Sequence, residues 1–279
     1  MSMLGLVRLC RLYYALPMSA GYLLTVYYAR GGRMEGFWLE SLMSAAALAL
    51  VIAAGYVLND VWDRRIDQVT HRRRPIVCGQ VSAVTAAIFG ALLWLGGLVV
   101  SFHGRPAFTL TLAVVGLCLV LYDAYSKRLG AAKQLVVAAL MTSIYPLALA
   151  EAGGASGPRA ASLAVFPVWL SITSFGYEIL KDLRDLPIDP PLAGRPSPLR
   201  ANPLRWRLIA NLAIAGSSLI LFAPALLGCG WIYLCAVMVA VGLAWAVSRA
   251  KVAAAIPLVY TEVFLVAIAA AADVMILGV

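Results

Sequence analysis

Long apolar runs limit what this chain can fold into more than any other feature of its sequence. Nine such segments, each about 17–24 residues long, are separated by polar or Gly/Pro-containing breaks. They cover residues 12–29, 37–59, 82–101, 107–123, 132–150, 160–180, 206–226, 229–247 and 256–277. Because a helix needs about 20 predominantly apolar residues to span a bilayer, each segment has the length of one spanning helix.

The composition excludes a water-soluble fold of this size. The 279 residues are 63% hydrophobic and 13% charged, whereas ordinary globular domains are about 45–50% apolar and about 25% charged. Too little polar surface would remain to cover the outside. No segment shows the alternation of polar and apolar residues that is typical of strands. We therefore predict an all-α polytopic membrane protein with about nine transmembrane helices, forming a single domain over residues 1–279.

The distribution of Lys and Arg predicts the orientation of this bundle. Of the 22 basic residues, only Arg30, Arg33, Arg105 and Arg159 fall on one side. The others lie at the N-terminus or near the loops after the second, fourth, sixth and eighth segments. Since cytoplasmic loops carry the excess of Lys and Arg, we expect the N-terminus and the basic loops in the cytoplasm. The net charge of +9 then reflects membrane orientation, and we expect the lipid bilayer rather than nucleic acid as a partner.

The acidic residues gather in two short windows, at the predicted cytoplasmic ends of the second and sixth segments. The first window holds Asp60, Asp63 and Asp67. Spacings of three and seven residues place these carboxylates within about 60° of one another on a helix. The first window therefore presents one acidic helix face.

The second window holds Glu178, Asp182, Asp185 and Asp189. Offsets of 4, 7 and 11 residues again give one face, provided that the helix continues. Pro187 is expected to bend or end the helix, because proline removes a helix hydrogen bond and disfavours helical backbone in the residue before it. Asp189 is therefore the least secure member of the second window.

Carboxylates stacked on one face repel one another, and the repulsion grows at a membrane edge where the dielectric constant is lower. A divalent cation removes this cost, and Mg²⁺ commonly binds one or two carboxylates together with substrate phosphates. Two such windows facing each other would hold a diphosphate through bridging Mg²⁺. The alternative is that the acids pair with the interleaved arginines at a solvated helix end.

The chain resembles the UbiA superfamily of intramembrane prenyltransferases. Residues 59–67 fit its N-D-x-x-D-x-x-x-D motif, and residues 73–82 resemble its R-P-I-x-x-G-x-I-S continuation. Residues 125–128, Tyr-Ser-Lys-Arg, are similar to the short basic loop after the fourth helix of the family. The second window resembles the form found in the branch that alkylates geranylgeranylglyceryl phosphate. It departs from that form at Tyr177, where Arg is common, and at Ile188, where Gly is common.

The resemblance implies a Mg²⁺-dependent transfer of a prenyl group from its diphosphate to a lipophilic or aromatic acceptor, with the active site facing the cytoplasm. The implied Mg²⁺ ligands are Asp60, Asp63, Glu178, Asp182 and Asp185. The implied diphosphate-binding residues are Asn59, Arg74, Tyr125, Lys127, Arg128, Tyr177 and Lys181. Lys127 and Arg128 would also stabilise the leaving group, and Asp67 and Asp189 would orient the acceptor or take its proton.

Three other functions remain open at this point. A terpene cyclase of the same fold would ionise the same diphosphate without an external acceptor. A membrane transporter would account for Glu262 and Asp273 inside the ninth segment, since ionisable residues within a membrane are functional candidates. We expect Glu262 to help line the cavity and Asp273 to reach water near the end of the segment. An alcohol phosphotransferase is disfavoured, because its D-G-x-x-A-R signature is missing. The acceptor, the prenyl chain length and the oligomeric state are left open.

Overall fold

The computed structural model describes residues 2–126, 129–157, 159–186 and 198–277, and all the regular elements in these ranges are helices. The chain divides into two compact units. The first comprises Met1–Leu23, Glu35–Arg128 and Pro146–Glu151, and the second comprises Leu24–Met34, Leu129–Tyr145 and Ala152–Val279. One helix near the N-terminus, α2 (Leu12–Ala29), and the short α7 (Ile144–Ala152) have residues in both units.

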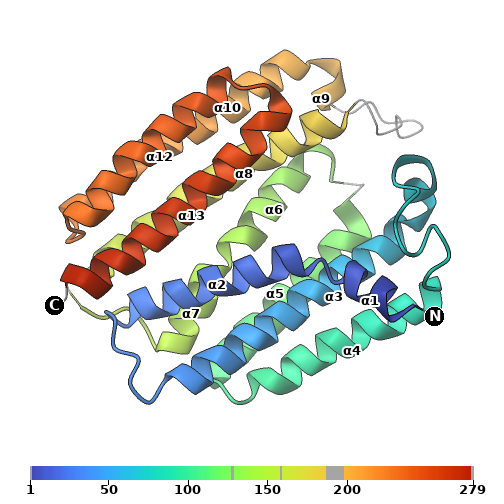
Figure 1. The fold of residues 1–279 in the computed structure, drawn as a ribbon, viewed down its shortest axis with the longest axis horizontal. Coiled ribbons are helices and arrows are strands. Elements are labelled where there is room, and N and C mark those ends of the chain that lie inside the picture. Colours follow the sequence, from blue (N-terminus) through green and yellow to red (C-terminus); the bar gives the residue numbers. More distant parts are fainter. Residues whose placement is uncertain (1, 127–128, 158, 187–197, 278–279) are drawn as a thin grey trace. The chain divides into compact units, whose positions relative to one another are not determined.

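The first unit is organised around one long helix. Its other helices are α1 (Met3–Leu9), α3 (Trp38–Thr70), α4 (Ala83–Ser101) and α5 (Pro106–Tyr125). Figure 1 shows α3 and α4 running side by side, and α3 also packs against α5. With 33 residues, α3 extends about 50 Å, against about 30 Å for the hydrocarbon core of a bilayer. Because its apolar residues come first, the surplus length is the acidic C-terminal part.

The second unit surrounds one buried helix, α8 (Val165–Asp185), which packs against three other helices of this unit. These are α6 (Lys133–Thr142), α10 (Pro203–Ile220) and α13 (Val252–Leu277). The unit also contains α9 (Pro198–Ala201), α11 (Ala223–Leu226) and α12 (Trp231–Arg249), with short 3-10 turns η2 (Gly130–Ala132) and η3 (Ala160–Ala164). The helix α8 ends at Asp185, two residues before Pro187, as the sequence predicts.

A close approach of two helix backbones fixes the position of α8 against α10. A Cβ atom at Gly176 would lie 2.7 Å from Cγ1 of Ile214 and 3.0 Å from the carbonyl oxygen of Ala210. Nearby, the hydroxyls of Thr173 and Ser217 are hydrogen-bonded at 2.8 Å. The absence of a side chain at residue 176 therefore lets α8, which carries the second acidic window, pack directly on α10.

Eight helical stretches of the described chain are long and apolar enough to cross a membrane. They correspond to the second through ninth predicted segments, so the all-α polytopic prediction is confirmed. The first predicted segment forms α2, an 18-residue helix that is not among these eight. Its tyrosines and Pro17 lower its hydropathy, which explains the difference from the nine segments read in the sequence. The orientation of the bundle and the single-domain interpretation stay predictions.

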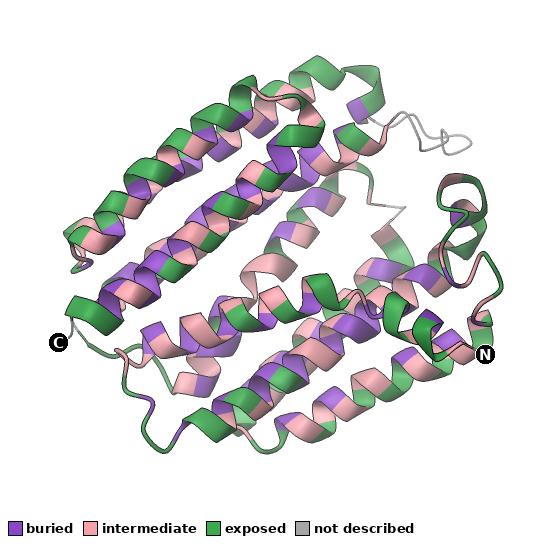
Figure 2. Ribbon diagram, viewed as in Figure 1, coloured by how far each residue is buried: buried purple, intermediate pink, exposed green. Residues whose placement is uncertain are grey.

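The outward faces of the helices are apolar, as a surface in contact with lipid requires. On α4, the residues Val84, Ile88, Leu92, Leu95 and Val99 are all more than half exposed and recur every three or four positions. Figure 2 shows exposed positions along the outer faces of the helices in both units. An exposed apolar stripe of this length would be a liability in water and is favourable in a bilayer.

Candidate functional site

The first acid cluster, formed by Asn59, Asp60, Asp63 and Asp67, lies on the last turns of α3. The carboxylates of Asp60 and Asp67 are almost fully buried, and Asp63 is partly buried. One nitrogen of Arg74, Nη1, donates to Oδ1 of Asp60 at 3.0 Å and to Oδ2 of Asp67 at 2.6 Å. The two carboxylates therefore share one helix face, as their spacing of seven residues predicts, and they also share one cation.

Arg11, in the short connection between α1 and α2, is a second cation at this cluster. Its Nη2 donates to Oδ1 of Asp60, and its guanidinium lies 5.2 Å from the ring centroid of Tyr56. Arg11 has a φ angle of +43°, the one positive value among the non-glycine residues that the structure describes. Such a backbone conformation is costly and is often found at functional sites. Burial raises the pKa of the thiol of Cys10, which precedes Arg11 in the chain.

A further carboxylate joins the first acid cluster from a different helix. Asp123, on α5, is buried with 6% of its surface exposed. Its Oδ1 accepts a hydrogen bond of 3.2 Å from the side-chain amide of Asn59. Its Oδ2 has no hydrogen-bond partner among the described residues. A buried carboxylate oxygen without a partner is energetically costly. This oxygen is therefore suited to accept a hydrogen bond from a ligand or to coordinate a metal ion.

The second acid cluster, formed by Glu178, Asp182 and Asp185, lies on the last two turns of α8. Glu178 is buried and forms an ion pair with Lys181, whose Nζ lies 2.6 Å from Oε2. The carboxylate of Asp185 is partly exposed and pairs with Arg184 at 2.7 and 3.0 Å. Burial therefore decreases along the cluster toward the helix end.

The central member of the second acid cluster, Asp182, is held by the neighbouring helix α6. The ammonium of Lys133 donates to Oδ1 of Asp182 at 2.8 Å, and the amide of Gln134 donates to Oδ2 at 2.7 Å. Both carboxylate oxygens are thus oriented by donors from residues 133 and 134. In the same unit, the hydroxyl of Tyr177 donates to that of Tyr260 at 2.8 Å, and its ring faces the ammonium of Lys181.

Four predicted site residues lie in or next to stretches outside the described residues. Lys127, Arg128 and Asp189 lie outside the described residues. Tyr125 is the last residue of α5 and is half exposed. The roles predicted for these four residues stay predictions.

The donor chemistry of both clusters fits Mg²⁺, although the side chains do not form a closed metal cage. No group of three or more His, Cys, Asp or Glu residues in the described ranges is gathered to hold a metal ion. Mg²⁺ usually keeps several waters and binds one or two carboxylates plus substrate phosphates, so a closed cage is not required. The partnerless oxygen of Asp123 is a free ligand atom at the first acid cluster. We name Asp60, Asp63, Glu178, Asp182 and Asp185 as the residues that would hold Mg²⁺.

The two acids inside the ninth segment have different environments. Glu262 is fully buried, and its Oε1 accepts a long hydrogen bond of 3.4 Å from the indole of Trp169. Asp273 is also fully buried, which contradicts the expectation that it reaches water. Its carboxylate lies 3.2 Å from Nε of Arg159 and accepts hydrogen bonds from the backbone amides of Gly230 and Tyr233. It thereby satisfies two of the free amides at the start of α12.

Four residues at the clusters were not predicted as site residues from the sequence: Arg11, Asp123, Lys133 and Gln134. In the sequence, Arg11 and Lys133 indicate only the orientation of the helices in the membrane. Asp123 has a usable signal, because it is an acid in the last turn of an apolar helix, as are the acids of both windows. Gln134 gives no comparable signal, since a lone amide in an apolar helix has no motif around it.

The fold and both clusters define a polytopic membrane protein with two acid-rich sites at helix ends. Residues 15–271 match the UbiA prenyltransferase family, and the chain belongs to this family. The resemblance seen in the sequence motifs is therefore confirmed.

Several relatives are digeranylgeranylglyceryl phosphate synthases. The chain is 31% identical to the one from Methanoculleus marisnigri, over 57% of this chain and 56% of the relative. It is 33% identical to the one from Methanoregula boonei, over 68% and 67%. With the one from Halobacterium salinarum it shares 28% identity over 84% and 82%. The match to the Methanoculleus marisnigri relative thus spans little more than half the length of that protein.

Solved structures show the same fold. A structure of digeranylgeranylglyceryl phosphate synthase aligns with a TM-score of 0.76 and 18% identity, over 97% of this chain and 98% of the other. A UbiA homologue from Archaeoglobus fulgidus bound to GPP and Mg²⁺ aligns with a TM-score of 0.68 and 13% identity, over 98% and 100%. At these identities the structural likeness establishes the all-α fold and does not by itself identify the substrate.

Proposed function

We propose that this chain is a Mg²⁺-dependent prenyltransferase that moves a geranylgeranyl group from its diphosphate to a glycerol phosphate lipid. The observation that carries the proposal is the first acid cluster, where two buried carboxylates share Arg74 and a third, Asp123, keeps a free oxygen. The family match and the relatives with this activity support the choice of prenyl donor and acceptor. The cytoplasmic side remains the proposed location of the site, because the basic loops accompany both clusters.

The reaction breaks the bond between C1 of the prenyl chain and the diphosphate oxygen. The electron pair leaves with the diphosphate, and the acceptor hydroxyl forms the new C–O bond at C1 and loses its proton. Negative charge develops on the leaving group, where donors fixed in advance stabilise it best. When bound, Mg²⁺ would neutralise part of that charge.

The cations at the clusters suit this role because each is already ordered. Arg74 and Arg11 are held by Asp60, and Lys181 is held by Glu178. A guanidinium binds phosphate oxygens through paired donors, and an ammonium acts as a point charge. We propose that these three residues, with Lys127 and Arg128, bind the diphosphate.

Two carboxylates are proposed for the acceptor. Asp67 is buried, accepts from Arg74 and lies 3.6 Å from Nδ1 of His71, so it is oriented and can accept a hydroxyl proton. Asp189 is proposed for the same role from the motif alone. The side-chain nitrogen of Asn59 donates a hydrogen bond to Asp123. The side-chain oxygen of Asn59 is not used in this contact and can accept a hydrogen bond from a ligand.

The test is diphosphate release by the purified full chain in detergent. Geranylgeranyl diphosphate is supplied with and without Mg²⁺, and with geranylgeranylglyceryl phosphate, a hydroxybenzoate or no acceptor. The variants are Asp60→Asn and Asp182→Asn, and the control is Glu35→Gln, an exposed acid in a loop.

We expect release that needs Mg²⁺ and the glycerol phosphate lipid, and that both Asp variants lose. Release with the hydroxybenzoate alone would overturn the acceptor class. Release without any acceptor would indicate the cyclase. Absence of release and of Mg²⁺-dependent diphosphate binding would overturn the enzyme and favour the transporter.

A further inference from the structure

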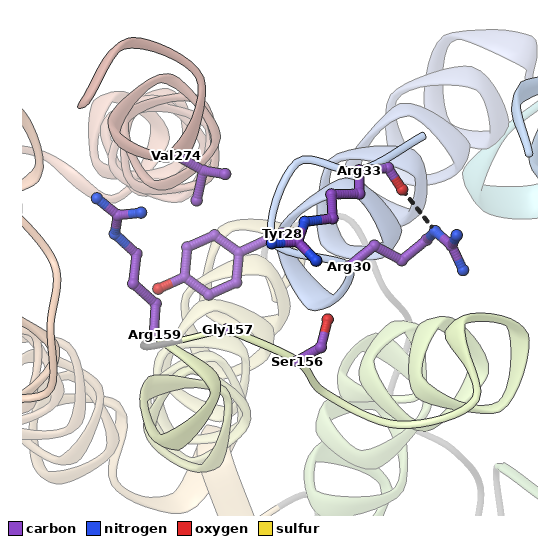
Figure 3. Close-up of a pocket in the computed structure, with 8 residues that line it drawn as sticks. Tyr28, Arg30, Arg33, Ser156, Gly157, Arg159 and Val274 are labelled. Carbon is purple, nitrogen blue, oxygen red and sulfur yellow. Dashed lines mark hydrogen bonds between the residues drawn. The ribbon is translucent and has the colours of Figure 1, made fainter. Parts of the chain in front are cut away.

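A small pocket lies within the second unit, at the far end of α8 from the second acid cluster. Its wall is formed by the turn after α2, the loop before η3 and the last part of α13, as Figure 3 shows. With 21 residues, α8 extends about 31 Å, close to the hydrocarbon thickness of a bilayer. The pocket is therefore at the level of the opposite membrane surface.

Three arginines line this pocket: Arg30, Arg33 and Arg159. The predicted orientation places only four basic residues on this side of the membrane, and the fourth, Arg105, belongs to the first unit. Basic residues are disfavoured on this side. Their concentration in one pocket of the described chain, with no acidic residue among those that line it, indicates a site for an anion.

The three guanidinium groups differ in their present partners. Arg159 is buried, with 8% of its surface exposed, and pairs with Asp273. Arg30 donates from Nε to the carbonyl oxygen of Arg33 at 2.8 Å, which holds the turn closed. The guanidinium of Arg33 is exposed and has no ion pair or hydrogen bond with the described residues. Arg33 is therefore the cation available to a ligand.

The pocket is built by two loops that are tied together. The backbone amide of Ser156 donates to the carbonyl oxygen of Ala29 at 2.8 Å. Gly31 and Gly157 both have positive φ angles, of +59° and +87°, and a Cβ atom at Gly31 would lie 3.9 Å from Cα of Gly157. The arginines thus project from a turn and a loop whose backbones are closely apposed, so the backbone that carries them is fixed before a ligand arrives.

Apolar residues at this end of the second unit indicate which anion binds in the pocket. Val274 lines the pocket, and Met275 and Ile276, which follow it on α13, are 75% and 66% exposed. Trp231, at the start of α12, is 66% exposed, and Trp is enriched at membrane–water interfaces. A guanidinium site with exposed apolar neighbours at this level matches a lipid, whose phosphate lies next to its acyl chains.

We propose that this pocket binds the phosphate group of an anionic membrane phospholipid on the membrane face opposite the second acid cluster. Arg33 makes the principal contact through its paired donors. Arg30 adds positive charge, whereas the charge of Arg159 is compensated by Asp273 and the hydroxyl of Ser156 already donates to the carbonyl oxygen of Ala29. The proposal does not depend on the prenyltransferase reaction.

The test is lipid binding by the purified full chain in a non-ionic detergent. Native mass spectrometry measures the retention of phosphatidylglycerol and of zwitterionic phosphatidylcholine. Arg33→Gln removes the charge of an exposed side chain, and Arg33→Glu reverses it. The matched control is Arg105→Gln, which removes a basic residue from the same side but not from the pocket. A third arm adds millimolar inorganic phosphate as a competitor.

We expect selective retention of phosphatidylglycerol, a loss of affinity of about tenfold in Arg33→Gln, a larger loss in Arg33→Glu and no change in Arg105→Gln. Equal retention of both lipids would overturn the proposal, as would equal losses in Arg33→Gln and Arg105→Gln. Displacement of the lipid by inorganic phosphate would overturn the lipid as the source of the anion. Thermal unfolding of each variant establishes that a loss of binding is not a loss of fold.

Discussion

The side-chain amide of Asn59 donates a hydrogen bond to Asp123, with 3.2 Å between Nδ2 and Oδ1. This contact joins the first residue of the acidic motif on α3 to an acid in the last turn of α5. A residue that holds a ligand side chain in place commonly matters nearly as much as the ligand itself. The pairing therefore extends the proposed site beyond its sequence motif.

We expect Asp123→Asn to weaken metal binding by about tenfold while leaving the fold intact. Asparagine keeps the oxygen that accepts from Asn59 but removes the negative charge. Binding of Mn²⁺, a paramagnetic substitute for Mg²⁺, can be measured by electron paramagnetic resonance with the diphosphate present. Asp123→Ala, which also frees the amide of Asn59, should weaken binding further. Unchanged Mn²⁺ affinity in both variants would show that Asp123 has only a packing role.

Replacement of Arg74 by Ala should destabilise the protein in the absence of Mg²⁺. Asp60 keeps its ion pair with Arg11, but Asp67 loses its guanidinium partner, and a buried charge that loses its partner costs up to about 3–5 kcal/mol. Added Mg²⁺ should recover more stability in this variant than in the wild type, since it replaces the missing cation. Thermal unfolding in detergent at several Mg²⁺ concentrations measures both effects. Arg65→Ala, which removes an exposed arginine of α3, is the control.

A methyl group at residue 176 should be poorly tolerated. In Gly176→Ala the new Cβ would meet the backbone oxygen of Ala210 at 3.0 Å, so α8 and α10 must move apart. Overpacking of this kind costs about 1–3 kcal/mol. Gly216→Ala is the matched control, because a Cβ atom at this helical position has nothing within 4 Å. Equal unfolding temperatures for the two variants would contradict the close packing of α8 on α10.

The pair formed by Arg159 and Asp273 should contribute strongly to stability at the far end of the second unit. Asp273→Ala leaves Arg159 without its ion pair and frees the backbone amides of Gly230 and Tyr233. We expect a loss of about 3–5 kcal/mol in the free energy of unfolding. Asp273→Asn, which keeps an acceptor oxygen, should lose less. Denaturant unfolding of the two variants checks the order, and a larger loss in Asp273→Asn would refute the capping role.

Much of the fold can be predicted from the sequence, because a helix that spans a bilayer needs about 20 predominantly apolar residues. The end of α8 before Pro187 and the common face of Asp60 and Asp67 followed from local rules of helix geometry. The environment of Asp273 did not follow, because its partner Arg159 is 114 residues away and their contact depends on tertiary packing. For the same reason local patterns do not predict that Lys133 and Gln134 of α6 orient Asp182.

The sharing of Arg74 by Asp60 and Asp67 has a consequence for how any metal ion would bind there. Arg74 and Arg11 already compensate the charges of the two carboxylates, so a metal that binds Asp60 and Asp67 must compete with guanidinium groups for carboxylate oxygens. A displaced guanidinium becomes a free donor at the moment when the metal brings a phosphate with it. Metal binding at this site would therefore be an exchange of cations rather than a simple addition. Its apparent affinity in the absence of diphosphate should accordingly be low.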